Sequence, residues 1–465
     1  MAVTKAVKDK TTDMTRGNPL KQMIWFSIPL IIGNIFQQFY SMVDTIIVGR
    51  TIGVQALAAV GSSGALSFFI LGFAMGLAGG FAIVVSQRFG AGDNENVRRS
   101  VATGAMLSAA FAVALTLLSA LSARWLLEVM HTPQDIIDDA WRYLVIIFWG
   151  VPATMFYNYI SSVIRALGDS KTPLYFLLVA SVLNIVLDFV CILNFHMGVA
   201  GAAVATIFSQ AVSGFLCLIY VGKHFPILRL KKSDWRFDRN FAWYHLRFGI
   251  PMAVQNSVIA LGAMAVQTIL NGFGAIAVAG YTAASKIEQM VSQVMMSFGL
   301  TLATYTGQNY GAMKLDRIRD GVKKITIILL LISAAGAVLM ILFGRSLTYI
   351  FIDAGEQNVE EVVRYSRRYL NVSVCFYPAL SAIFIFRSAL QGIGNTGIVL
   401  VGSAVELICR LVGALILAIP LGYLGVCLAG PFAWAGAAVL FLIIYIRDIR
   451  KLSKKFQCGE LATAV

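Results

Sequence analysis

The chain has 465 residues, of which 58% are hydrophobic and only 13% are charged, and its mean hydropathy is +0.78. Values this apolar exclude a soluble globular protein and are typical of a protein that crosses the bilayer many times. The formal net charge of +14 does not indicate nucleic-acid binding, because the lysines and arginines lie between apolar segments and form no continuous basic face. The six cysteines include no CxxC pair, so neither a disulfide framework nor a zinc site is expected.

Twelve segments are apolar enough and long enough to cross a bilayer as helices. They cover approximately residues 22–48, 56–85, 98–122, 141–164, 173–194, 199–221, 245–270, 276–305, 322–343, 369–390, 397–419 and 424–446. Four of them contain a proline, at Pro29, Pro152, Pro251 and Pro378. Bilayer helices tolerate proline where neighbouring groups satisfy the freed carbonyls, so bent helices are expected. The sequence predicts an all-α integral membrane protein.

Basic residues between the spans set the expected orientation. The tails at 1–21 and 447–465 and the stretch 222–244 are all rich in lysine and arginine, and the span count places them on the same side. The side of the membrane that collects positive charge is the cytoplasmic side. We therefore expect a multi-pass protein of the plasma (inner) membrane with both termini in the cytoplasm.

The two halves of the chain form an internal duplication. FSIP at Phe26 recurs as FGIP at Phe248, and QRFGA after the second span recurs as QNYGA after the eighth. Three further positions recur at a constant offset of 226, namely Tyr143, Pro152 and Gly168 as Tyr369, Pro378 and Gly394. Six spans in each half give both copies one orientation, with a pseudo-twofold axis along the membrane normal. We predict an N-lobe over 22–221, a cytoplasmic linker over 222–244 and a C-lobe over 245–446.

Polar residues of the first half fall inside segments that otherwise read as lipid-embedded helix. They are Asp44, Asn184, Asp188 and Thr206. An intramembrane carboxylate is costly and marks a site whose partner must be found. The helical rise puts Asp44, Asp188 and Thr206 about 9 to 12 Å from the outer ends of their spans, and Asn184 lies one turn below Asp188. We expect Asp44, Asp188 and Thr206 to share one depth, with Asn184 one turn below on the same helix face as Asp188.

Two neighbouring carboxylates in a medium of low dielectric constant cannot both stay ionised, so this group is expected to hold a proton or a cation. Amide and hydroxyl oxygens suit a hard monovalent cation such as Na⁺, and they equally suit a proton relay. The choice between H⁺ and Na⁺ stays open, and no other cofactor or metal is expected. The structural alternative is that Asp44 and Asp188 cap helix ends or pair with Arg50.

Longer motifs carry a resemblance to a known family. They are MVDTIIVGRTIGVQALAAVG from Met42, SQRFGAGD from Ser86, LNIVLD from Leu183, GVAGAAVAT from Gly198 and GQNYGA from Gly307. With these motifs the chain resembles the multidrug and toxic compound extrusion (MATE) family, within a superfamily that also holds polysaccharide and lipid-linked oligosaccharide flippases. The resemblance covers all twelve spans. It implies two six-helix bundles that export cationic or amphipathic organic compounds in exchange for H⁺ or Na⁺, with the four polar residues above as the coupling site.

The second half departs from part of that family. Many members carry a glutamate in the middle of the seventh span, where this chain has Ile259, so a sodium site in the second half is doubtful. Glu406 and Arg410 stand four residues apart and are predicted to neutralise one another, unless they face the cleft and contact substrate. Glu288 is expected to face the cleft and attract cations.

Polar side chains within spans are the candidates for substrate contact, because unneeded amides are unfavourable in lipid. They are Asn34, Gln37, Tyr40, Gln255, Asn256, Glu288, Glu406 and Arg410.

The leading hypothesis is an antiporter that works by alternating access and is not an enzyme. Its expected partners are small organic cations and membrane lipids, with no nucleic acid, and a monomer is expected. A flippase for a lipid-linked oligosaccharide or another amphipathic metabolite would share the architecture, but it would be expected to show a more basic cleft. A polytopic membrane enzyme would need a catalytic loop, and the longest loop, 222–244, is merely basic. A channel would not need a twofold pair of bundles with buried titratable groups.

Overall fold

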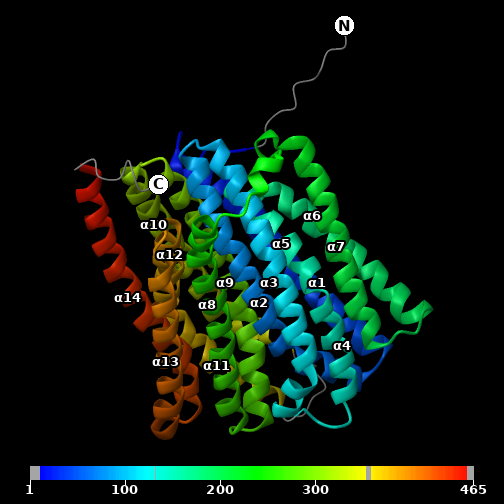
Figure 1. The fold of residues 1–465 in the computed structure, drawn as a ribbon. Coiled ribbons are helices and arrows are strands. Elements are labelled where there is room, and N and C mark those ends of the chain that lie inside the picture. The colour runs from blue at the N-terminus through cyan, green and yellow to red at the C-terminus, as the bar shows by residue number, and fades with distance from the viewer. Residues whose placement is uncertain (1–10, 131, 352–357, 458–465) are drawn as a thin grey trace. The chain divides into compact units, whose positions relative to one another are not determined.

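The computed structural model describes residues 11–130, 132–351 and 358–457, so the outer parts of both predicted tails, 1–10 and 458–465, lie outside the described residues. Within this part of the chain every regular element is a helix, which agrees with the predicted all-α fold. Figure 1 shows the helices coloured along the chain.

The first half contains seven α-helices. They are α1 (Pro19–Thr51), α2 (Val54–Gly90), α3 (Asn94–Val129), α4 (Ile137–Trp149), α5 (Val151–Ala166), α6 (Lys171–Phe189) and α7 (Val199–His224). A π-helical turn, η1 (Val190–Asn194), extends α6, and the linker holds two short 3₁₀ turns, η2 (Pro226–Leu228) and η3 (Lys232–Trp235).

The second half also contains seven α-helices in the described residues. They are α8 (Arg239–Asn271), α9 (Ala275–Gly311), α10 (Leu315–Thr348), α11 (Val359–Cys375), α12 (Tyr377–Gly392), α13 (Thr396–Leu421) and α14 (Tyr423–Gln457).

These helices account for the twelve predicted spans. Among the described residues, eight helices are long and apolar enough to cross a membrane, and two bent pairs bring the number to ten. The pairs are α4 with α5, bent by 47°, and α11 with α12, bent by 53°. Pro152 and Pro378 begin the second helix of each pair, so the bends predicted there are confirmed. The other two predicted spans coincide with α1 and α9, which have 33 and 37 residues but are not among the helices apolar enough to be counted.

Pro29 and Pro251 lie inside the continuous helices α1 and α8. The chain divides into two compact units, and a boundary between them falls within each of these two helices. The first unit holds the tail up to Met14 and Ile28–Ser257, and the second holds Thr15–Ser27 and the chain from Val258 onward. Each leading helix therefore starts in the unit formed mainly by the other half of the chain.

In the first unit, α2 packs against α3, α4 and α5, and α7 packs against α4, α5 and α6. The start of α8 approaches α2 so closely that a Cβ atom on Gly80 would lie 2.6 Å from the Cα atom of Gly249. Small residues allow membrane helices to make such backbone contact. Phe81 fills the adjoining space and is completely buried.

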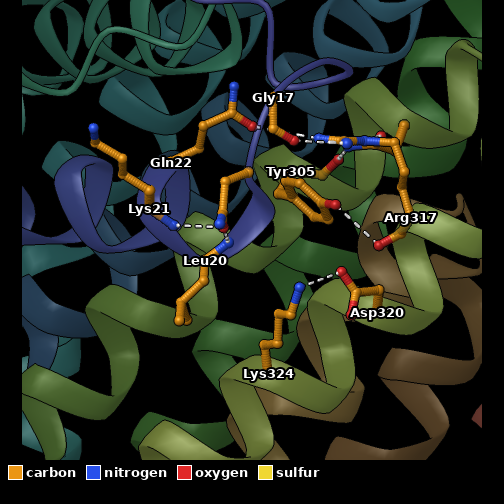
Figure 2. A network of polar contacts seen from close by, with 10 residues as sticks. Gly17, Leu20, Lys21, Gln22, Tyr305, Arg317, Asp320 and Lys324 are labelled. Carbon is orange, nitrogen blue, oxygen red and sulfur yellow. Dashed lines mark hydrogen bonds and ion pairs between the residues drawn. The ribbon is translucent and has the colours of Figure 1, made fainter.

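In the second unit, α9 packs against α10, α11 and α12, and α14 packs against α13 and α12. The segment that leads into α1 is held here by Arg317 of α10, as Figure 2 shows. Its guanidinium donates to the Gly17 carbonyl at 2.9 Å and to Asn309 Oδ1 at 3.0 Å, while the Tyr305 hydroxyl donates to the Arg317 carbonyl. Further along α1, the hydroxyls of Ser27 and Thr301 lie 2.7 Å apart.

Candidate functional site

The four residues predicted as a coupling site come from three helices of the first unit. Asp44 lies on α1, Asn184 and Asp188 lie on α6, and Thr206 lies on α7. Asn184 and Asp188 are completely buried at 0% exposure, although both are polar. The structure brings the four side chains together, while their role in coupling stays a prediction.

The carboxyl groups of Asp44 and Asp188 lie within hydrogen-bonding distance of one another. One oxygen of each, Oδ1, is buried and has no hydrogen-bond partner among the described residues. Neither carboxyl forms an ion pair with Arg50 in this part of the chain, so the expected structural alternative of an Arg50 pair is not seen. Two ionised carboxyls at this separation would repel strongly, so the pair needs a positive charge, either a proton or a cation.

The Asn184 amide connects this pair to α7. With its nitrogen facing Asp188, Nδ2 donates to Asp188 Oδ2 at 3.2 Å. The amide oxygen then accepts from the backbone N–H of Thr206 at 3.1 Å and from its hydroxyl at 3.3 Å. This orientation gives both ends of the amide a partner of opposite polarity, so Asn184 fixes the position of the Asp188 carboxyl.

Two tyrosines complete the group. Tyr40 of α1 lies close to Thr206, and Tyr143 of α4 lies near both Asp44 and Asp188. The sequence predicts Tyr40 as a substrate contact and indicates no role for Tyr143. A signal for Tyr143 was available in the repeat, because Tyr143 and Tyr369 occupy equivalent positions in the two halves.

The local structure around Asp188 is unusual for a membrane helix. α6 passes into the π-helical turn Val190–Asn194 two residues after Asp188. Such turns are rare and occur frequently at functional sites. Beyond it, Gly198 adopts a φ of +58°, which favours glycine, and α7 begins at the next residue. The resulting donor set of carboxylate, amide and hydroxyl oxygens fits a proton or a hard monovalent cation.

Among its described residues the second unit holds two buried carboxyls, Glu288 and Glu406, which have different partners. Glu288 of α9 is 7% exposed and accepts a hydrogen bond from the Tyr369 hydroxyl of α11. Glu406 and Arg410 of α13 form an ion pair at 2.8 Å, which confirms the predicted neutralisation. Among the described residues Glu288 therefore has a hydroxyl partner but no ion pair.

The amides proposed as substrate contacts lie in different surroundings. The Asn256 side chain donates to the Gly72 carbonyl of α2 at 2.9 Å, so this amide ties α8 to α2. Gln255 beside it is 5% exposed, whereas Gln37 of α1 is exposed and Asn34 is partly buried. Substrate contact by these residues stays a prediction.

A charged residue that we did not predict lies on α12. Arg387 is half-buried within the tenth span, and its guanidinium lies 5.1 Å from the centre of the Phe384 ring. It is also close enough to Glu406 to interact with it electrostatically. The signal in the sequence is the single arginine in the apolar stretch IFIFRSAL from Ile383.

Comparison with known proteins gives consistent matches over both halves. The MatE family model matches residues 29–190 and 251–424. The chain is 32% identical over 389 residues to the probable multidrug resistance protein YpnP of Bacillus subtilis, covering 83% of this chain and 85% of that protein. It is 26% identical to the probable multidrug resistance protein NorM of Thermotoga maritima, covering 81% and 80%.

A solved structure of a MOP superfamily transporter from Pyrococcus furiosus has the same fold. The TM-score is 0.89 at 23% sequence identity, and the match covers 96% of this chain and 99% of that one. The twelve-helix arrangement in two bundles is thus the arrangement of known transporters.

Proposed function

Because this chain belongs to the MATE family of membrane transporters, which is not a family of enzymes, we propose that it exports cationic or amphipathic organic compounds in exchange for a cation. Two kinds of observation support the proposal. Relatives of similar length carry the name multidrug resistance protein. The first unit also contains a pair of neighbouring carboxyls, one buried and one partly buried, that needs a positive charge.

The Asp44–Asp188 pair is the observation that carries the proposal. Its two unpartnered oxygens are available to a proton or a Na⁺ ion, and Asn184 and Thr206 add neutral oxygen ligands. Binding of the ion removes the repulsion between the carboxyls and changes how α1 packs against α6. The ion drives transport only if it binds the outward-open and inward-open states with unequal affinity.

Placement in the cell follows from charge. We place both termini in the cytoplasm and the protein in the plasma (inner) membrane, because the lysine- and arginine-rich segments fall on one side of the spans. We propose that the protein works as a monomer, because each half supplies a complete six-span bundle. The alternative of a flippase for lipid-linked oligosaccharides is not favoured, because the buried carboxyls attract cations and repel a pyrophosphate.

The test is efflux of a fluorescent organic cation from vesicles that contain the purified protein, under an imposed pH gradient or Na⁺ gradient. Wild type should respond to one of the two gradients, which names the ion. Asp188→Asn should still bind the dye, but its gradient-driven efflux should fall by roughly 5- to 150-fold. Typical coupling free energies correspond to factors of this size. Asp135→Asn, an exposed carboxyl before α4, is the matched control.

Two outcomes would contradict the proposal. Wild type that moves no cation under either gradient would remove the antiport assignment, and lipid flipping would be assayed next. A fully coupled Asp188→Asn protein would leave antiport intact but place the coupling site elsewhere.

A further inference from the structure

The exposed face of α14 changes from apolar to cationic within one turn. Val439 and Ile443 are both 58% exposed and Ile446 is 40% exposed on this face. Four basic residues then continue the same face, namely Arg447, Arg450, Lys451 and Lys454. Residues three or four positions apart share one face of a helix, and these four are either neighbours or spaced in this way. Ile443, Ile446 and these four residues line one groove of about 490 Å³, which we call the α14 groove.

Among the described residues this positive charge is largely without a counter-charge. The nearby carboxylate of Asp448 accepts a hydrogen bond from the Asn395 side chain, and its other contact is Arg447 at 3.3 Å. Arg450, Lys451 and Lys454 form no ion pair within the described chain. Asp448 therefore interacts with Asn395 and Arg447. Arg450, Lys451 and Lys454 have no counter-charge among the described residues.

Some other basic residues at the same ends of the spans have protein partners, whereas Arg229, Lys232 and Arg236 of the linker are exposed and form no ion pair among the described residues. Arg99 at the start of α3 pairs with Asp238 at 2.7 Å, and Lys324 of α10 pairs with Asp320 at 2.6 Å. A general need for positive charge on this side of the membrane explains all these residues equally. It does not explain why the charges of the α14 groove are unpaired and aligned below an apolar face.

The position of the change matches the thickness of a bilayer. The helix from Tyr423 to Ile446 is about 36 Å long, enough to cross a hydrocarbon layer of about 30 Å with some tilt. Arg447 to Lys454 then rises about 10 Å through the headgroup layer and beyond it. An apolar face that continues into a cationic one complements a phospholipid, whose acyl chains adjoin a negatively charged headgroup.

We propose that the α14 groove binds an anionic phospholipid of the cytoplasmic leaflet. The acyl chains lie along Ile443 and Ile446, and the headgroup contacts Arg450, Lys451 and Lys454. The two parts of the ligand are recognised by different chemistry, so a free anion or a zwitterionic lipid satisfies only one of them. This lipid site is separate from the coupling residues of α1, α6 and α7.

The experiment is native mass spectrometry of the purified full chain titrated with phosphatidylglycerol or phosphatidylcholine. Wild type should bind phosphatidylglycerol more tightly than phosphatidylcholine. The triple variant R450Q/K451Q/K454Q should lose this preference by roughly 100-fold, since each cation near an anionic headgroup contributes about fivefold. The matched control R229Q/K232Q/R236Q removes the same charge from exposed linker residues and should keep the preference.

Three results would overturn the proposal. Wild type could bind both lipids equally, or the linker control could lose as much as the triple variant. Glycerophosphoglycerol, the headgroup without acyl chains, could compete as well as the lipid, which would indicate an anion site only. If the triple variant does not fold, K451Q/K454Q is measured instead, with an expected loss of roughly 25-fold from two cations. No arm uses transport, so the result is separate from the antiport proposal.

Discussion

At one helix contact the two units use different side chains at equivalent positions. In the first unit Gly80 of α2 lies against Gly249 of α8, close enough for backbone contact. In the second unit the repeat places Thr301 of α9 and Ser27 of α1 at these positions, and their hydroxyls are 2.7 Å apart. The duplication has kept the contact between the helices, while van der Waals packing in one unit has become a polar contact in the other.

The buried carboxyls differ in the same way. In the first unit Asp44 and Asp188 lie side by side, each with an unpartnered oxygen, whereas in the second Glu288 accepts from the Tyr369 hydroxyl and Glu406 pairs with Arg410. The equivalent tyrosine of the first unit, Tyr143, lies near the carboxyl pair. The tyrosine occurs in both copies, whereas the side-by-side pair of carboxyls is found only in the first among the described residues. This comparison supports the proposal that the coupling cation binds in the first unit.

The largest expected effect concerns the glycine contact. A Cβ atom on Gly80 would meet the backbone of Gly249, which cannot move aside as a flexible side chain would, so Gly80→Leu should lower stability by roughly 3 kcal/mol or more. The equivalent change in the second unit, Thr301→Ala, removes one hydroxyl contact and should cost only about 1 kcal/mol. Thermal unfolding of the purified variants, followed by tryptophan fluorescence, gives the two Tm values.

The control for that comparison lies on the same helix. Gly64 of α2 is exposed and has no atom within 4 Å of a built Cβ, so Gly64→Leu should leave the Tm close to that of wild type. An equal loss for Gly80→Leu and Gly64→Leu would show that general loss of glycine, and not backbone contact, causes the effect.

An intermediate effect is expected at Glu288. Glu288→Gln keeps the shape of the side chain and can still accept from Tyr369, so gradient-driven efflux should stay within about threefold of wild type, equivalent to roughly 0.6 kcal/mol. Tyr369→Phe should behave similarly. The same vesicle assay as for Asp188→Asn measures both variants.

Loss of gradient dependence in Glu288→Gln would mean that both units carry a coupling carboxyl, and the comparison would fail. Weaker binding of the dye with coupling intact would instead place Glu288 among the substrate contacts.

The sequence predicted how deep the polar residues lie in their spans, but it did not predict which neighbouring helix each one faces. Helical rise along the apolar segments placed Asp44, Asp188 and Thr206 at one level, and the structure brings them together. Spacing along one helix also predicted the Glu406–Arg410 pair correctly. These inferences need only the geometry of single helices, which the sequence contains.

The missed features depend on which helices are neighbours. Hydropathy gives no information on rotation of a helix or on the bundle against which it packs, so Tyr143 and Arg387 received no role. For the same reason the sequence did not predict that the first part of α1 belongs to the second unit and the first part of α8 to the first unit. The sequence also gives no sign of the bond that the Asn256 side chain donates to the Gly72 carbonyl, while substrate contact by Asn256 stays a prediction.

The smallest expected effect concerns the caps of the two exchanged helices. Asp238 accepts from the backbone amides of Asn240 and Phe241 at the start of α8 and from Arg99. At the start of α1, the neutral side chain of Asn18 accepts from the amides of Leu20 and Lys21. The two caps thus have the same geometry but different charge.

The charged cap should make the stability of the first unit depend on pH. The backbone amide of Phe241, with that of Asn240 and the Arg99 guanidinium, holds the pKa of Asp238 below its usual value. A group with a lowered pKa in the folded state stabilises at neutral pH, and this contribution is lost as the pH falls below about 4. Asp238→Asn should therefore lower the Tm slightly at pH 7, and the difference from wild type should shrink on acidification. The reciprocal change Asn18→Asp should create the same dependence at α1, and pH-independent differences for both variants would show that the caps act through geometry and not through charge.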